Sequence, residues 1–157
     1  MIKVGDKIPE RLGVDQDGNE ITRENLAGQR VILYFYPKDN TSGCTAQACS
    51  LRDGITDLKE AGYTVIGVSK DSAKSHKGFI EKHGLPFPLI ADTETELNQA
   101  FGVWVEKSMY GRKYMGTQRT TFVIDEAGVV RAIVAGKDVK TKEHAAQLIK
   151  IINELDK

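Results

Sequence analysis

The sequence predicts an α/β fold in which helices pack on a central mixed β-sheet. Residues 31–36 and 65–68 are continuous apolar runs rich in β-branched and aromatic side chains, as in strands buried on both faces. Apolar residues at helical spacing follow the first run, and a helix-cap signal follows the second. Residues 120–125 and 129–134 flank a Glu-Ala-Gly turn, which predicts an antiparallel hairpin before the last helix.

The first elements are expected to be a hairpin, a strand and a helix. An N-terminal β-hairpin is predicted because residues 12–15 and 21–22 flank the turn signal Asp-Gly-Asn at 17–19. After the strand at 31–36, a single helix that begins at Cys44 is predicted. Its inward face holds five side chains within about 40° of one direction at 100° per residue: Cys44, Ala48, Leu51, Ile55 and Leu58.

The second half of the chain continues the alternation of helices and strands. Asp71 and Ser72 are candidate caps of a helix, residues 87–90 form a short edge element, and Thr93 with Glu96 predicts a capping box for another helix. The last helix has an apolar face made of Ala145, Leu148, Ile149, Ile152 and Leu155. This order of elements indicates a thioredoxin-like three-layer sandwich.

Length and charge narrow the class of protein. One domain spanning residues 1–157 is expected, and a domain of this size buries roughly 70% of the surface of its unfolded chain. The 22 basic residues balance the 22 acidic ones, so neither nucleic acid nor an anionic membrane is expected as a partner. No signal-peptide core and no run near the ~20 apolar residues of a membrane span is present, so a cytoplasmic location is expected.

Cys44 and Cys49 are the only cysteines. In reducing surroundings they are expected to be catalytic, redox-sensing or inert, because permanent structural disulfides are rare there. Cys44 follows a buried strand and a polar loop and stands at the start of the predicted helix, where free N–H groups and the helix dipole favour a thiolate. The pattern indicates chemistry on sulfur, and the alternative is a small buried hydrophobe.

Residues 37–44 read Pro-Lys-Asp-Asn-Thr-Ser-Gly-Cys, which resembles the P-x-x-x-T-x-x-C motif of the peroxiredoxins. With the following Thr-Ala-Gln-Ala-Cys, the block is similar to the bacterioferritin comigratory protein, or PrxQ, branch of that family. Further matching blocks follow in the same order along the chain, at residues 4–9, 67–71, 89–92, 114–116 and 119–125. Ser42 stands where this branch commonly has proline, and Gln47 stands where it also has glutamate.

The resemblance implies a thiol peroxidase that reduces hydrogen peroxide or an alkyl hydroperoxide without a metal or organic cofactor. It implies that Cys44 attacks the peroxide and becomes a sulfenic acid, with Arg119 as the cation beside it. Thr41 is expected to orient the peroxide oxygens through its hydroxyl, and Pro37 to shield the sulfenic acid from water. A dithiol such as thioredoxin would regenerate the enzyme.

Cys49 is the expected resolving thiol, which condenses with the sulfenic acid to give an intrachain disulfide. Because no second subunit is needed, a monomer is expected. On a regular helix, residues five apart have Cα atoms about 8.6 Å apart and point about 140° away from each other. A disulfide needs Cα atoms within about 6.8 Å. The first turns of the helix are therefore predicted to unwind during turnover.

Other interpretations remain open. A thiol–disulfide oxidoreductase would carry C-x-x-C at the helix start, whereas four residues separate these cysteines. A redox-sensing or holdase-like binding module would use the disulfide as a switch and would react once, where a peroxidase cycles. Cys49 could be a surface thiol, with an external thiol as the resolving group. Arg119 could be an ordinary surface charge.

The remaining reactive and aromatic side chains suggest no further site. His76, His83 and His144 share no common spacing, so packing or surface roles are expected in place of a metal centre. Trp104, Tyr110 and Tyr114 could line a surface for the peroxide or the reductant, but aromatic residues near Gly111 and Gly116 more often pack a loop, and no role is assigned to them.

Overall fold

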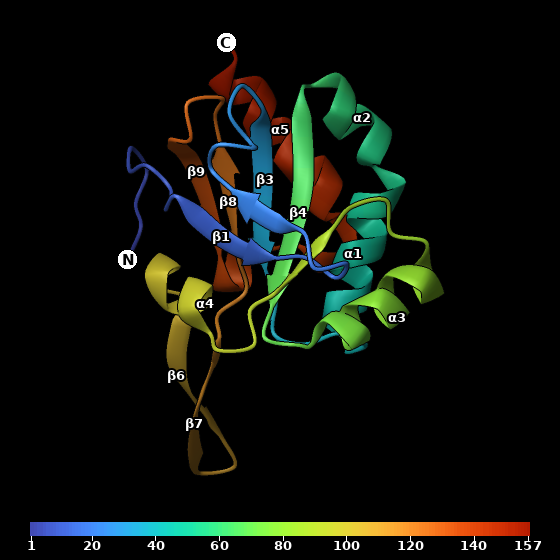
Figure 1. Cartoon of the computed structure of the whole chain (residues 1–157), viewed down its shortest axis with the longest axis vertical. Coiled ribbons are helices and arrows are strands. Elements are labelled where there is room, and N and C mark those ends of the chain that lie inside the picture. The colour runs from blue at the N-terminus through green and yellow to red at the C-terminus, as the bar shows by residue number, and fades with distance from the viewer.

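The computed structural model describes residues 1–157, and at its centre is a five-stranded mixed sheet (Figure 1). The strand order is β5-β4-β3-β8-β9. The strands are β3 (Arg30–Phe35), β4 (Tyr63–Ser69), β5 (Leu89–Ala91), β8 (Thr120–Ile124) and β9 (Val130–Ala135). β3, β4 and β5 run parallel, while β8 is antiparallel to both β3 and β9. The predicted central strand and closing hairpin are confirmed.

Two hairpins lie outside this sheet. β1 (Arg11–Val14) and β2 (Glu20–Thr22) pair antiparallel, as predicted. β6 (Trp104–Met109) and β7 (Arg112–Thr117) form a second hairpin, which projects from the body of the molecule (Figure 1). The expectation that aromatic residues pack a loop here is wrong for Tyr110 and Tyr114, which are exposed on this hairpin. Tyr110 lies at the tip with φ 51° and is 99% exposed.

β3 separates two apolar cores, because its side chains alternate between the faces of the sheet. Ile32 and Tyr34 join one core with α1 (Ser42–Asp53), α2 (Ile55–Glu60), α3 (Ala73–His83) and α5 (His144–Leu155). Leu33 and Phe35 join the other core, with α4 (Glu96–Phe101) and the N-terminal hairpin. The predicted three-layer sandwich is confirmed.

The single helix predicted over residues 44–58 is in fact two helices. α1 begins at Ser42, two residues before Cys44, and ends at Asp53, while α2 starts after Gly54. A Cβ on Gly54 would collide with the Cβ of Ala145 in α5. The missing side chain therefore lets α5 pack closely where the two helices meet.

The start of α4 also differs from the prediction. The capping box expected from Thr93 and Glu96 is not formed. The N–H groups of Leu97 and Asn98 donate instead to the carboxylate of Asp92, at 3.0 and 2.8 Å. An acidic side chain before a helix satisfies its free N–H groups in the same way as a cap residue. None of the helices combines the length and apolar character needed to cross a bilayer.

His144, the first residue of α5, is fully buried between two hydrogen-bond partners. Its Nδ1 lies 2.9 Å from Gln147 Oε1, and its Nε2 lies 2.8 Å from the Thr121 hydroxyl of β8. Because the amide oxygen only accepts, Nδ1 carries the proton, Nε2 accepts from Thr121, and the ring is neutral. Burial lowers the pKa of His144 to about 4; the hydrogen bond to Gln147 opposes this shift and the charge on Arg119 reinforces it.

Acid is expected to destabilise the fold through His144. A histidine in the unfolded chain titrates near 6.5 and His144 in the fold at about 4, so between these values the folded state binds fewer protons. The free energy of unfolding should therefore fall, by up to roughly 3 kcal/mol, as the pH drops from 6.5 to 4. Urea unfolding at several pH values should show a clearly smaller fall for His144→Gln. An equal fall in both proteins would contradict this assignment.

Candidate active site

Cys44 lies in the first turn of α1, just beyond the loop that follows β3. Thr41 is the N-cap residue, and the N–H of Thr45 donates to the Thr41 carbonyl at 2.8 Å. The N–H of Cys44 therefore precedes the first bonded turn, where unpaired N–H dipoles favour negative charge. The side chain of Cys44 is only 1% exposed, so its sulfur is shielded from bulk water.

Arg119 reaches Cys44 because of the way the strands pair. Thr120, the first residue of β8, pairs with Phe35, the last residue of β3, so the preceding residue lies beside the loop that leads to α1. The guanidinium donates from Nη2 to Cys44 Sγ at 3.4 Å and from Nη1 to Gln47 Oε1 at 2.7 Å. These two bonds orient the guanidinium, and its charge favours a thiolate.

Two further residues shape the surroundings of the sulfur. A Cβ on Gly43 would lie 3.1 Å from Arg119 Nη2, so a glycine at this position gives the guanidinium room against the first turn of α1. Lys107 of β6 is half-buried and lies near both Arg119 and Cys44. Burial lowers the pKa of Lys107, Arg119 lowers it further, and Cys44 opposes the shift. The sequence pattern of residues 104–117 does not predict the β6–β7 hairpin. Lys107 therefore could not be identified from the sequence as a neighbour of the site.

Thr41 and Pro37 lie on the loop that carries Cys44. The Thr41 hydroxyl is exposed and donates to the Lys38 carbonyl at 2.9 Å, which leaves its oxygen able to accept another hydrogen bond. The N–H of Tyr36 still donates to β4, at 3.0 Å from the Val68 carbonyl. Pro37 has no N–H and ends the pairing there.

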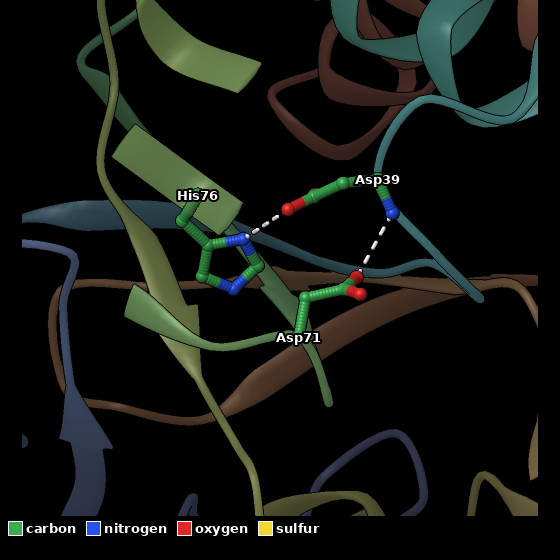
Figure 2. Close-up of side chains that lie close together, drawn as sticks. All are labelled: Asp39, Asp71 and His76. Carbon is green, nitrogen blue, oxygen red and sulfur yellow. Dashed lines mark hydrogen bonds and ion pairs between the residues drawn. The ribbon is translucent and has the colours of Figure 1, made fainter. Parts of the chain in front are cut away.

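A buried cluster fastens this loop to the start of α3 (Figure 2). The Asp39 carboxylate accepts from His76 Nδ1 at 2.8 Å, from the Tyr36 hydroxyl at 2.5 Å and from the Ser75 hydroxyl at 2.8 Å. The backbone N–H of Asp39 donates to the Asp71 carboxylate at 2.9 Å. The loop before α1 is therefore held by both the side chain and the backbone of one residue.

His76 is fully buried between two acceptors in this cluster. Its Nε2 lies 3.0 Å from the Ile90 carbonyl, and its Nδ1 lies 2.8 Å from the Asp39 carboxylate. Burial would raise the pKa of Asp39, but the hydrogen bonds from His76, Tyr36 and Ser75 outweigh it and lower that pKa.

The three side chains drawn in Figure 2 have ligand-type atoms within 4.8 Å of one another. These atoms already form hydrogen bonds with one another and with their neighbours. We therefore interpret the cluster as one that holds the loop in place. No sequence signal singles out Asp39, because its partners come from distant parts of the chain.

Cys49 lies five residues after Cys44 on the same unbroken helix, and both thiols are free. Its Sγ is partly buried and lies 3.9 Å from Nδ1 of His83 in α3. Of the five site residues predicted from the sequence, Cys44 and Arg119 are in direct contact, while Thr41 and Pro37 share the loop. The helix keeps Cys49 in separate surroundings.

Comparison with known proteins agrees with this geometry. The model of the AhpC/TSA family matches residues 4–133. Peroxiredoxin Bcp of Bacillus subtilis is 40% identical over 154 residues, which is 98% of this chain and 97% of that protein. Peroxiredoxin Bcp of Escherichia coli is 43% identical over 143 residues, 91% of this chain and 90% of that protein.

Solved structures give the same result. A PrxQ variant from Xylella fastidiosa superimposes with a TM-score of 0.90 at 30% identity and covers 100% of this chain and 99% of its own. The bacterioferritin comigratory protein of Xanthomonas campestris gives 0.85 at 33% identity, with 97% and 100% covered.

The chain belongs to the AhpC/TSA family. Its relatives place it in the Bcp/PrxQ group of peroxiredoxins, which are peroxidases with a thioredoxin-like fold. The resemblance drawn from the block that ends at Cys49 is thus confirmed.

Replacing Arg119 is expected to make Cys44 less reactive. In Arg119→Met an unbranched apolar side chain remains, but the charge and both hydrogen bonds are lost. In a Cys49→Ser background we expect iodoacetamide to alkylate Cys44 about 10-fold more slowly at pH 7, and hydrogen peroxide to react about 100-fold more slowly. Arg112→Met, on the exposed β6–β7 hairpin, is the matched control. Equal rates in the two variants would show that Arg119 does not activate the thiol.

Proposed function

We propose that Cys44 is the peroxidatic thiol, that Cys49 resolves its sulfenic acid within the same chain, and that a thioredoxin-like dithiol regenerates both thiols. The observation that carries the proposal is the Arg119 guanidinium, 3.4 Å from the buried Cys44 sulfur at the start of α1. The cation and the N–H dipoles of the helix both favour the thiolate, which is the form that attacks peroxides.

In the first step the Cys44 thiolate attacks one peroxide oxygen. A sulfur–oxygen bond forms, the O–O bond breaks, and the leaving oxygen departs as water or an alcohol after taking up a proton. Arg119 stays beside the reacting atoms and stabilises the negative charge as it moves. Thr41 orients the peroxide through its hydroxyl oxygen, and Pro37 keeps water away from the sulfenic acid.

Hydrogen peroxide and alkyl hydroperoxides are the proposed substrates. The Xanthomonas campestris bacterioferritin comigratory protein, which shares this fold at 33% identity, has been studied for alkyl peroxide reduction through trapped intermediate and ligand complexes. The attack requires only the terminal O–O group of the substrate, and either class of peroxide presents it.

Cys49 must leave its place on α1 to resolve Cys44. A regular helix holds their Cα atoms about 8.6 Å apart, against the roughly 6.8 Å limit for a disulfide. Residues 42–49 read Ser-Gly-Cys-Thr-Ala-Gln-Ala-Cys, and Leu51 is the first large apolar residue of the helix. Unwinding the first two turns therefore gives up little apolar burial. The Asp39 cluster holds the preceding loop, so the change stays local.

The proposed enzyme is a monomer with one domain over residues 1–157. An intrachain disulfide needs no residue from a second subunit. The reducing cytoplasm is the proposed location, because thioredoxin-like dithiols there would keep the cycle turning.

Replacing each cysteine is expected to block a different step of the catalytic cycle. Cys44→Ser should abolish the fast reaction with hydrogen peroxide, while Cys49→Ser should keep that phase and stop at the sulfenic acid. Stopped-flow kinetics with a thioredoxin turnover assay would measure both. A protein that reacts once without cycling would support a redox sensor or holdase-like module. A wild type no faster than a free thiol would overturn the peroxidase mechanism.

Oxidation is expected to open the first turns of α1. Backbone amides in residues 45–49 should exchange at least about 10-fold faster in the oxidised protein, because their helical hydrogen bonds are lost. Hydrogen exchange followed by mass spectrometry measures this, and α5 provides an internal control that should not change. A demonstrated Cys44–Cys49 disulfide with unchanged protection would refute the unwinding.

A further inference from the structure

The thiol proposed to resolve the reaction lies against a histidine at the end of a different helix. Cys49 Sγ is 3.9 Å from Nδ1 of His83, the last residue of α3. Two contacts hold His83 in place. The ring of Phe79 meets the imidazole nearly at right angles with centroids 5.2 Å apart, and Arg52 Nη1 donates to the His83 carbonyl at 2.8 Å. The second contact ties the end of α3 to α1.

We propose that His83 is the base that takes the proton of Cys49 in the resolving step. This inference rests on the proposed role of Cys49. A thiol must become a thiolate before it attacks sulfur, and an imidazole nitrogen in contact with the sulfur can accept its proton. The contact exists while α1 is intact, so the proton is transferred before Cys49 leaves the helix to reach Cys44.

The step balances without any outside oxidant. The proton passes from Cys49 Sγ to His83 Nδ1, and the thiolate then attacks the sulfenic sulfur of Cys44. The S–S bond forms as the S–O bond breaks, and the oxygen leaves as water with a proton returned by His83 through solvent. The sulfenic sulfur is reduced while the Cys49 thiol is oxidised.

None of the other titratable and charged groups around Cys49 is available as the base. Arg52 is three residues further along α1 and cannot accept a proton. Asp53 is engaged in an ion pair with Arg52 at 2.9 Å. Tyr34 lies in β3 beneath the helix, and burial raises its pKa, so its hydroxyl stays neutral. Among these groups, only the histidine ring offers a nitrogen lone pair that can accept the proton of a thiol.

The test separates the two chemical steps in the full-length protein. The reduced protein is mixed with one equivalent of hydrogen peroxide and quenched at set times, and sulfenic acid and disulfide are quantified by mass spectrometry from pH 5 to 8. We expect His83→Gln to leave sulfenic acid formation unchanged and to slow disulfide formation about 100-fold at pH 7. Lys82→Gln, at the exposed neighbouring position, is the matched control and should behave as wild type.

A second variant separates a base from a packing residue. In His83→Gly, added imidazole should restore much of the rate of disulfide formation, because a free base can occupy the vacated space. If His83→Gln keeps a rate within about threefold of wild type across the pH range, or if imidazole fails to rescue His83→Gly, the assignment of His83 as a base is wrong.

The same experiment distinguishes this inference from the proposed function. If Cys49→Ser accumulates sulfenic acid while the His83 variants resolve normally, only the role of His83 fails. If Cys49→Ser loses its sulfenic acid as fast as wild type, Cys49 is not the resolving thiol, and both ideas fail together.

Discussion

Antiparallel pairing of β3 with β8 is the constraint on which the site depends. It places Thr120 opposite Phe35, and so brings Arg119 within hydrogen-bond distance of Cys44 although the two are 75 residues apart. β3 is buried on both faces, so both apolar cores hold this register. A slip of two residues would move Arg119 by about 6.8 Å, beyond the reach of the sulfur.

The two proposed steps, attack on the peroxide and formation of the disulfide, place opposite requirements on α1. While intact, it presents its N-terminus to Cys44, and by the same geometry it keeps Cys49 away. The loop before it is fastened through Asp39, and the far end of the helix packs against α5 at Gly54. Small side chains fill the turns between these fixed ends. Under the proposed mechanism this stretch opens while the two fixed ends keep the surrounding core in place.

α3 contacts both the loop before Cys44, through Asp39, and Cys49 itself. His76 and His83 are seven residues apart, close to two full turns, so they project on the same side of the helix. Phe79 lies between them and packs against Tyr36 on one side and His83 on the other. The buried His76 thus holds the loop before Cys44 through Asp39, and the half-buried His83 contacts Cys49 two turns further on. The surroundings of the two histidines differ, because His76 lies between two acceptors.

The sequence by itself determined the buried strands, the order of the elements and the place of Cys44 at a helix start, because apolar periodicity and turn signals are local. Arg119 could be assigned only with the help of the family resemblance and the expected end of its strand. The break at Gly54 could not be predicted, because it depends on Ala145, which comes from the last helix. The contact of His83 with Cys49 was decided by tertiary structure alone, as were the hydrogen bonds of Asp39 that hold the loop before α1. Such contacts join residues distant in the chain, and only the packing of helices on the sheet brings them together.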